Sequence, residues 1–230
     1  MTKAVLGIIG GSGIYDLPGL AKARQKKVKS PWGEPSAPLR MGEIAGTEVV
    51  FLSRHDRGHR LSPSGINYRA NIDVLKRVGV TDLVSLSACG SFKQELPPGT
   101  FVLVDQFVDR TYKQQGYSVI GMTNLPEAKL AREAEICYAT VAMVTDFDCW
   151  HPDHDAVTVQ DIIAVLTANA EKAKGLVARL ARDFPREHEP CPGGSDRALD
   201  TALITAPEAR DPALLKKLDA VAGRVLKKKK

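Results

Sequence analysis

The chain alternates short apolar runs, rich in β-branched residues, with segments of helical periodicity. The first run, residues 3–9, stops abruptly at the glycine cluster 10–13, as a buried strand does before a tight turn. Further strands are predicted over residues 48–52, 82–86, 101–104, 118–120 and 138–144. Strands that alternate with helices are typical of an α/β protein, and we expect a single domain over residues 1–230.

Helical segments separate these runs. Residues 67–78 have apolar side chains at helical spacing and end at Gly79, which is a typical helix stop. Thr158 begins a long amphipathic segment, with Asp161 as its expected capping-box partner. Two further helices are predicted over residues 127–135 and 212–226.

Composition indicates a soluble protein with a sizeable core, since 43% of the 230 residues are hydrophobic and 26% are charged. No apolar run is long enough to span a bilayer, and residues 1–20 lack a signal-peptide pattern, so we expect a cytoplasmic protein without a membrane partner. The wide spacing of the four cysteines indicates reduced thiols rather than disulfides or a metal cluster: Cys89, Cys137, Cys149 and Cys191.

The formal net charge of +5 includes a lysine run at residues 227–230. No RNA-binding signature or aromatic-interleaved basic stripe accompanies this run, so a solvated tail explains it better than a nucleic-acid arm. We expect no nucleic-acid partner and a mild attraction for anionic substrates.

Three predicted strand ends carry groups that suit an oxyanion. The turn at residues 10–13 offers backbone N–H groups and the Ser12 hydroxyl, although a plain tight turn explains it equally well. A dinucleotide fingerprint is a weak alternative, because Asp16 stands where its third glycine would be. Arg54 and His55 follow the second strand as potential donors, and Ser87 follows the third. Because ligands of such sheets gather at the carboxyl ends of strands, these groups could meet one anion.

Asp146 and Asp148 follow the apolar run 138–144. Two carboxylates at this spacing could bind a metal or the edge of a purine. A protonated carboxyl can donate to N7 of adenine while another oxygen accepts from N6, provided that burial raises its pKa. A solvated loop is the alternative, which Phe147 and Trp150 make less attractive.

Three pairs have residue types that a zinc or manganese hydrolase uses: His55 with His59, Asp146 with Asp148, and His151 with His154. None belongs to a His-Glu-x-x-His helix, and Pro152 breaks any helix between the last two histidines. We therefore favour an anion site without a metal.

These motifs together resemble the trimeric purine nucleoside phosphorylase family, and within it the methylthioadenosine phosphorylase branch. The matching stretches keep the family order from residue 5 to about residue 180: residues 7–13, 54–55, 63–71, 88–91, 105–111, 122–123 and 145–150. The last forty or so residues carry little of the resemblance.

The resemblance implies a nucleoside phosphorylase-like fold, with a mixed central β-sheet flanked by helices. It implies cleavage of 5'-methylthioadenosine by inorganic phosphate, a co-substrate, to adenine and 5-methylthioribose 1-phosphate, with no metal or organic cofactor. It also implies a homotrimer. A purine nucleoside phosphorylase of broader or 6-oxopurine specificity is the alternative.

The resemblance also implies roles for particular residues. Asp146 and His55 are the expected catalytic residues, and Met122 is expected beneath the ribose. Asp146 and Asp148 are expected to contact the base, and an aspartate at position 146 favours a 6-aminopurine because relatives that prefer 6-oxopurines usually carry asparagine there. Val159 is expected near the 5' group of the sugar. The expected phosphate ligands are Ser12, Arg54, His55, Ser87, Ala88 and Thr123.

One departure from the family is large. In the family a long segment separates the Asp-Arg-Thr motif at residues 109–111 from the Met-Thr motif at residues 122–123, and it carries a Glu-Gly-Pro-x-Phe loop that contacts base and ribose. Here the two motifs almost adjoin. We expect that the protein carries this segment near residues 113–116 and that the printed sequence omits it, because a true deletion would remove core strands and a helix. If the segment is truly absent, we expect a nucleoside- or anion-binding protein with little or no turnover.

An intact-mass measurement separates these two cases. We expect a mass above 24.9 kDa, the mass of the 230 residues. A mass equal to that value would show that the segment is missing from the protein.

Overall fold

The computed structural model describes residues 2–108, 116–148, 150–152 and 158–226 of the chain. Its centre is an eight-stranded mixed sheet with the order β2-β3-β4-β1-β5-β8-β6, in which β7 pairs with β5 off this path. The central strands run parallel to one another: β1 (Leu6–Gly10), β4 (Thr47–Ser53), β5 (Asp82–Ser91) and β8 (Cys137–Phe147). The others join antiparallel: β2 (Ala21–Lys26), β3 (Leu39–Ile44), β6 (Phe101–Leu103) and β7 (Val119–Ile120).

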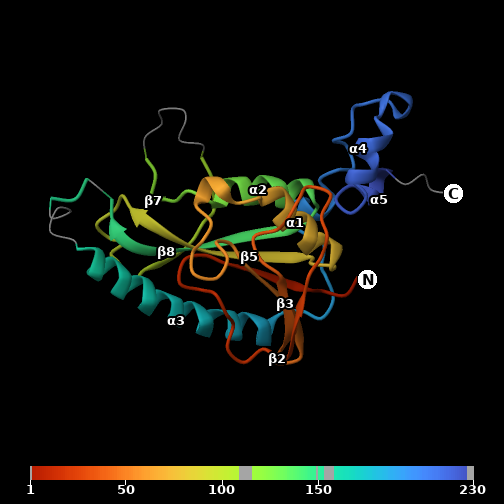
Figure 1. Ribbon diagram of the computed structural model, residues 1–230. Coiled ribbons are helices and arrows are strands. Elements are labelled where there is room, and N and C mark those ends of the chain that lie inside the picture. The colour runs from red at the N-terminus through yellow and green to blue at the C-terminus, as the bar shows by residue number, and fades with distance from the viewer. Residues whose placement is uncertain (1, 109–115, 149, 153–157, 227–230) are drawn as a thin grey trace.

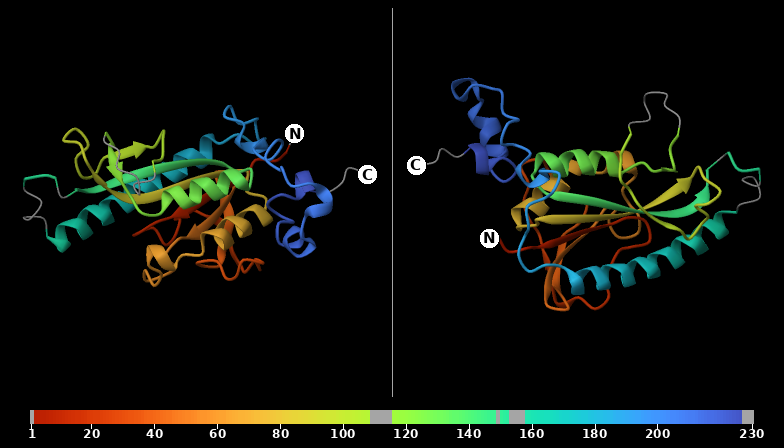
Figure 2. Two further views of the ribbon diagram at one scale, coloured as in Figure 1. Left: turned by 90° about the horizontal axis from the view of Figure 1, so that it is seen from above. Right: turned by 180° about the vertical axis from the view of Figure 1, so that it is seen from behind.

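Helices cover both faces of the sheet (Figure 1). On one face lie α1 (Tyr68–Arg77) and α2 (Asn124–Glu133), and on the other lies the long α3 (Val159–Asp183). The views from above and behind show the same layers (Figure 2). The expected mixed central sheet flanked by helices is therefore confirmed.

Alternate residues of the central strands build two separate cores. Ile9 of β1 and Leu52 of β4 pack with α1 and α2, whereas Ile8 and Phe51 pack with α3. Strands buried on both faces read as continuous apolar runs, which is why they stand out in the sequence.

The helix starts and stops match the sequence signals. The Asn67 side chain caps α1, and Gly79 beyond its end has a φ of 91°. Thr158 and Asp161 form the expected capping box of α3. Within the described residues, no helix is long and apolar enough to cross a membrane.

Several boundaries differ from the sequence prediction. The first strand begins at Leu6 rather than at residue 3, whereas β5 and β8 extend to Ser91 and Phe147, beyond the predicted ends. Both extensions pair with each other, so Ser87 and Asp146, which we placed after the strands, lie within the ladder, whereas Asp148 follows it.

Two strands and one helix break were not predicted. Both missed strands, β2 and β3, lie at one edge of the sheet, where β2 is exposed along its whole length and shows no apolar alternation. The predicted helix over residues 212–226 is two short helices, α4 (Pro212–Lys217) and α5 (Gly223–Leu226). Between them, the Asp219 carboxylate binds Arg77 of α1 and accepts a hydrogen bond from the N–H of Ala220, which holds the turn.

The short 3-10 helices complete the element list: η1 (Pro63–Gly65), η3 (Ser195–Arg197) and η4 (Pro207–Ala209). Of these, η1 leads into α1 and lies beside the ends of the central strands.

The close packing at the end of β1 yields a stability prediction. A Cβ at Gly10 would press against the carbonyl oxygen of Ile14 and lie 2.7 Å from the Phe51 ring, so we expect Gly10→Ala to cost about 1–3 kcal/mol. Gly175 of α3 is the matched control, because no described heavy atom lies within 4 Å of its added Cβ, and Gly175→Ala should add up to about 1 kcal/mol. Urea unfolding of both variants measures the difference, and equal effects would contradict the packing argument.

Candidate active site

A cavity of about 620 Å³ opens at the carboxyl ends of β1, β4, β5 and β8. Its lining includes every residue that the sequence analysis placed in the site except Val159: Ser12, Arg54, His55, Ser87, Ala88, Met122, Thr123, Asp146 and Asp148. Val159 begins α3 with 67% of its surface exposed and lies outside the lining. The structure thus brings the separate strand ends together at one cavity, as the sequence predicted.

The turn after β1 brings its backbone close to Arg54. A Cβ at Gly11 would lie 2.6 Å from Nη1 of Arg54, so only glycine admits the guanidinium here. Gly13 has a φ of 83°, a conformation that glycine adopts without strain. The glycine cluster therefore reflects the close approach of Arg54 at Gly11 and the positive φ at Gly13.

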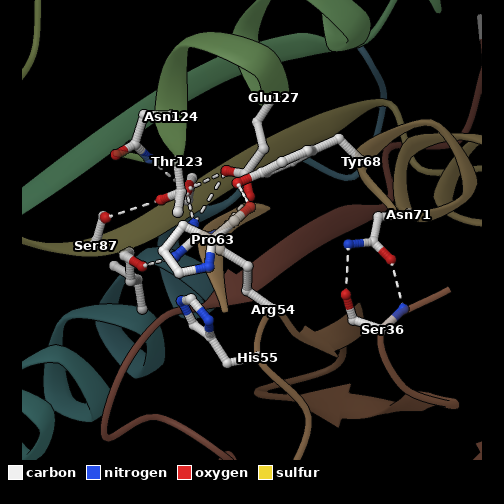
Figure 3. A network of polar contacts seen from close by, with 12 residues as sticks. Ser36, Arg54, His55, Pro63, Tyr68, Asn71, Ser87, Thr123, Asn124 and Glu127 are labelled. Carbon is white, nitrogen blue, oxygen red and sulfur yellow. Dashed lines mark hydrogen bonds and ion pairs between the residues drawn. The ribbon is translucent and has the colours of Figure 1, made fainter. Parts of the chain in front are cut away.

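The Arg54 side chain is 1% exposed, and most of its N–H groups donate to acceptors inside the protein (Figure 3). Nε and Nη2 donate to the Glu127 carboxylate at 2.5 and 3.0 Å. Nη2 also donates to Ser85, and Nη1 donates to the carbonyl oxygen of Leu86 at 3.1 Å. A guanidinium has five N–H groups, so one N–H of Nη1 has no partner in the part of the chain that the structure describes.

The charge of Arg54 is secure in this position. Burial disfavours the charged guanidinium, but the ion pair with Glu127 outweighs it and raises the pKa of Arg54. The site therefore holds a permanent cation that is largely neutralised by its own partner.

Two hydroxyls face each other beside this pair. Oγ of Ser87, on β5, lies 3.3 Å from Oγ1 of Thr123, the N-cap residue of α2. The Thr123 side chain makes no capping bond to its own helix, which leaves its hydroxyl directed to the cavity lining. A helix N-terminus next to hydroxyls and an arginine N–H is a suitable environment for an anion.

His55 is buried, and its Nδ1 lies 2.8 Å from the carbonyl oxygen of Leu61. This contact assigns the proton to Nδ1, because a carbonyl can only accept. Burial is the largest effect on the ring and lowers its pKa, and the stacked ring of His59 at 4.2 Å acts in the same direction. In the neutral ring Nε2 is therefore an acceptor, and the additional donor expected from the sequence exists only when His55 is protonated.

A β-bulge places Asp146. Cys89 pairs with Val144 and Gly90 pairs with Asp146, so Thr145 is an extra residue on β8. A bulge re-aims the side chain that follows it. The side chains of Asp146 and Asp148 both lie next to Gly90. A Cβ added at Gly90 would lie 3.5 Å from Cβ of Asp148 and 3.7 Å from Oδ2 of Asp146.

The Thr145 hydroxyl contacts Asp146. Oγ1 of Thr145 lies 2.6 Å from Oδ1 of Asp146 and 3.1 Å from the carbonyl oxygen of Cys89. One hydroxyl proton serves one of these acceptors, so when Thr145 donates to Cys89 its oxygen can accept from a protonated Asp146. This geometry accommodates both protonation states of the carboxyl.

The Cys89 thiol also lines the cavity, but burial raises its pKa to about 12. It stays protonated near neutral pH, so it is not an activated nucleophile.

The side of the site next to Met122 is open. Met122 is 79% exposed, and a second cavity of about 660 Å³ adjoins the first through Cys89, Ile120, Gly121 and Met122. Its walls come from β6, β7, β8 and residues 104–108, and they are mainly apolar. Val108 and Gly116 of this wall flank residues 109–115 in the sequence, where the expected additional segment falls and which lie outside the described residues.

Sequence reasoning missed Glu127 and its neighbours Ser85, Asn124 and Tyr138. Glu127 was predicted only as the start of a helix rich in Ala, Lys, Arg and Glu over residues 127–135. Its position offers a signal, however, because Glu127 shares a helical face with Ala131 and Ala134, and both alanines are buried. A carboxylate in a buried stripe requires a cationic partner.

Among the described residues, no three side chains of histidine, cysteine, aspartate or glutamate are arranged to hold a metal ion. His154 and Cys149 lie outside the described residues.

Comparison with known proteins agrees with this geometry. The family model for the phosphorylase superfamily matches residues 5–115 and 108–182. The chain therefore belongs to the phosphorylase superfamily. Within the superfamily it is similar to S-methyl-5'-thioadenosine phosphorylases, which confirms the resemblance inferred from the motifs.

The relatives include the S-methyl-5'-thioadenosine phosphorylase of Bradyrhizobium diazoefficiens, 68% identical over 290 aligned positions that cover 99% of this chain and 100% of the relative. The corresponding protein of Rhodospirillum rubrum is 46% identical over 97% of this chain and 98% of its own length. Among solved structures, a methylthioadenosine phosphorylase from an Antarctic soil metagenomic library has a TM-score of 0.77 at 34% identity, covering 96% of this chain and 99% of that one. Methylthioadenosine phosphorylase from Schistosoma mansoni in complex with adenine has a TM-score of 0.71 at 26% identity, covering 81% and 93%.

The comparisons also bear on the departure from the family. The two family-model matches overlap at residues 108–115. The alignment with the Bradyrhizobium protein spans 290 positions, more than the 230 residues of this chain, so that relative has positions without a counterpart here.

The neutral, buried His55 predicts a pH dependence of stability. Its folded pKa lies below the ordinary value of 6.5, so the unfolded chain binds a proton more readily and stability is lost as pH falls below about 6.5. We expect the free energy of unfolding to fall more steeply between pH 7 and 5 in the wild type than in His55→Gln, by up to about 1.4 kcal/mol per pH unit. Urea titrations at several pH values measure the slopes, and parallel slopes would argue against a buried neutral ring.

Proposed function

We propose that this protein cleaves 5'-methylthioadenosine with inorganic phosphate, forming adenine and 5-methylthioribose 1-phosphate. One observation carries the proposal: a cavity that joins Arg54 and the hydroxyls of Ser87 and Thr123 to the carboxyls of Asp146 and Asp148. A phosphate and the edge of an adenine are complementary to these two halves. The 68% identical relative named for this activity supports the choice of nucleoside.

The reaction follows from charge. As the C1'–N9 bond stretches, the ribosyl group becomes cationic and the purine becomes anionic. Asp146, when protonated, gives its proton to N7 and so neutralises the leaving base, while a phosphate oxygen stabilises C1' and then bonds to it. The residues supply preorganised electrostatics, and phosphate is the only further reactant.

Residue roles follow in the same proposal. Ser12, Arg54, His55, Ser87, Ala88 and Thr123 hold phosphate, with neutral His55 accepting from a phosphate O–H through Nε2, and Met122 lies beneath the ribose. Asp148 assists Asp146 in contacting the base. Val159 near the 5' group stays a prediction, because its side chain lies outside the cavity of this single chain.

We propose a single domain over residues 1–230 and a role in purine and methionine salvage, in a cytoplasmic homotrimer that needs no cofactor and no nucleic-acid or membrane partner. The exposed Met122 and the apolar walls of the second cavity support a covering segment or subunit in the functional protein. The expectation of a further segment near residues 113–116 remains a prediction, which the intact mass tests.

The decisive assay measures adenine release from 5'-methylthioadenosine with and without phosphate. The proposal requires that release depends on phosphate; release that ignores phosphate identifies a hydrolase. Comparison with inosine tests the alternative of a phosphorylase with broader or 6-oxopurine specificity. Phosphate and nucleoside binding without any turnover, at a mass of 24.9 kDa, identifies the non-catalytic alternative.

The proposed role of Asp146 predicts the effect of its replacement. Asp146→Ala should lower kcat by roughly 10²–10⁴-fold, since it removes the acid that protonates the base. Asp146→Asn should shift preference from methylthioadenosine towards 6-oxopurine nucleosides, because the amide can donate to a base oxygen. Steady-state kinetics on both substrate types measure this, with the exposed Asp183→Ala as a control, and an unchanged preference would contradict contact with the base.

A further inference from the structure

We propose that Glu127 is a positioning residue for the oxyanion half of the site: through Arg54 and the first turn of α2, it sets the affinity for inorganic phosphate. The inference rests on the proposed function and extends it to a side chain that lies behind the cavity lining.

The first part of the argument is the geometry of the ion pair. The side chains of Arg54 and Glu127 are each 1% exposed, and both carboxylate oxygens accept from the guanidinium. Two parallel N–H···O contacts fix the plane of the guanidinium as well as its distance. That plane determines where the remaining N–H of Nη1 points.

The second part is the position of α2. Oε2 of Glu127 accepts from the hydroxyls of Ser85 at 2.8 Å and Tyr138 at 3.2 Å, and these residues belong to the neighbouring strands β5 and β8. Asn124, in the same turn of α2, donates to Ser85 at 2.9 Å. The first turn of the helix is therefore held to the sheet by polar contacts that end on Glu127 and Ser85.

These contacts determine the position of Thr123. Thr123 directly precedes Asn124 as the N-cap of α2, and its hydroxyl lies 3.3 Å from that of Ser87. One buried carboxylate thus orients the arginine that enters from β4 and the hydroxyl that enters from α2 (Figure 3). Both belong to the lining that we assign to phosphate.

A purely structural ion pair would have a different signature. Replacing both partners of a buried pair by well-packed apolar residues is often neutral for stability, whereas a change in one partner leaves the other charge poorly paired and destabilises the fold. A structural role alone would lower stability and leave phosphate affinity unchanged. A positioning role changes phosphate affinity and leaves adenine affinity unchanged, because Asp146 and Asp148 come from another strand.

The chain contains a matched control. Glu135, just beyond the other end of α2, is also buried and accepts from Arg224 through both oxygens, at 2.7 and 2.5 Å. This pair lies outside the cavity lining. Glu135→Asp shortens a buried carboxylate in the same way as Glu127→Asp, away from the site.

The experiment measures the dissociation constants of inorganic phosphate and of adenine by isothermal titration calorimetry, with thermal unfolding to confirm the fold. We expect Glu127→Asp to weaken phosphate binding by about tenfold or more, a size typical for loss of a group that orients a ligand-binding side chain. Ser85→Ala, which removes one uncharged contact, should weaken phosphate binding by about 2- to 10-fold. Glu135→Asp should leave it within about twofold, and adenine binding should be unchanged in all three.

The inference is overturned if folded Glu127→Asp binds phosphate like the wild type, or if Glu135→Asp weakens it equally. Should Glu127→Asp fail to fold, Ser85→Ala decides alone, and unaltered phosphate binding in that variant overturns the inference. Wild-type protein that binds phosphate without releasing adenine contradicts the proposed function only. Wild-type protein that binds no phosphate overturns both.

Discussion

The buried contact between Arg54 and Glu127 is the interaction on which the arrangement of the site depends. An arginine at a strand end would ordinarily extend into water, but here four acceptor contacts from two elements, α2 and β5, hold it at 1% exposure. The bidentate contact with the Glu127 carboxylate offsets the free energy lost when the Arg54 charge is removed from water. Glycine at position 11 completes the arrangement, since any side chain there would displace the guanidinium.

The second constraint is the parallel sheet itself. Because β1, β4, β5 and β8 run in the same direction, their carboxyl ends meet at one edge, and groups far apart in sequence face one cavity. The bulge at Thr145 then turns Asp146 relative to its neighbours on β8. Different features therefore position the two halves of the site: the Arg54–Glu127 ion pair positions the oxyanion half, and the bulge at Thr145 positions the purine half. On the side of Met122 this cavity adjoins the second cavity, whose walls are mainly apolar.

Sequence signals succeeded where local physics decides the outcome. The apolar runs of the central strands, the glycine stop of α1 and the capping box of α3 are short-range features, and each was placed within a few residues. Sequence signals failed where a contact between residues far apart in the chain determines the local structure. Exposed β2 has no pattern of its own and pairs with β3. The break between α4 and α5 depends on the bond from Asp219 to Arg77 of another helix. Glu127 was overlooked because its partner lies 73 residues away in the chain.

By itself, the sequence indicated the α/β class, the family and nine of the residues that line the cavity, since these follow from periodicity and from motifs in a characteristic order. Tertiary structure alone decided how those side chains act. It showed that one N–H of Arg54 has no partner among the described residues, that the neutral His55 ring has an acceptor where a donor was expected, and that Val159 lies outside the cavity lining. Hydrogen-bond roles and burial depend on partners brought together by the fold, and the linear order of residues does not contain those distances.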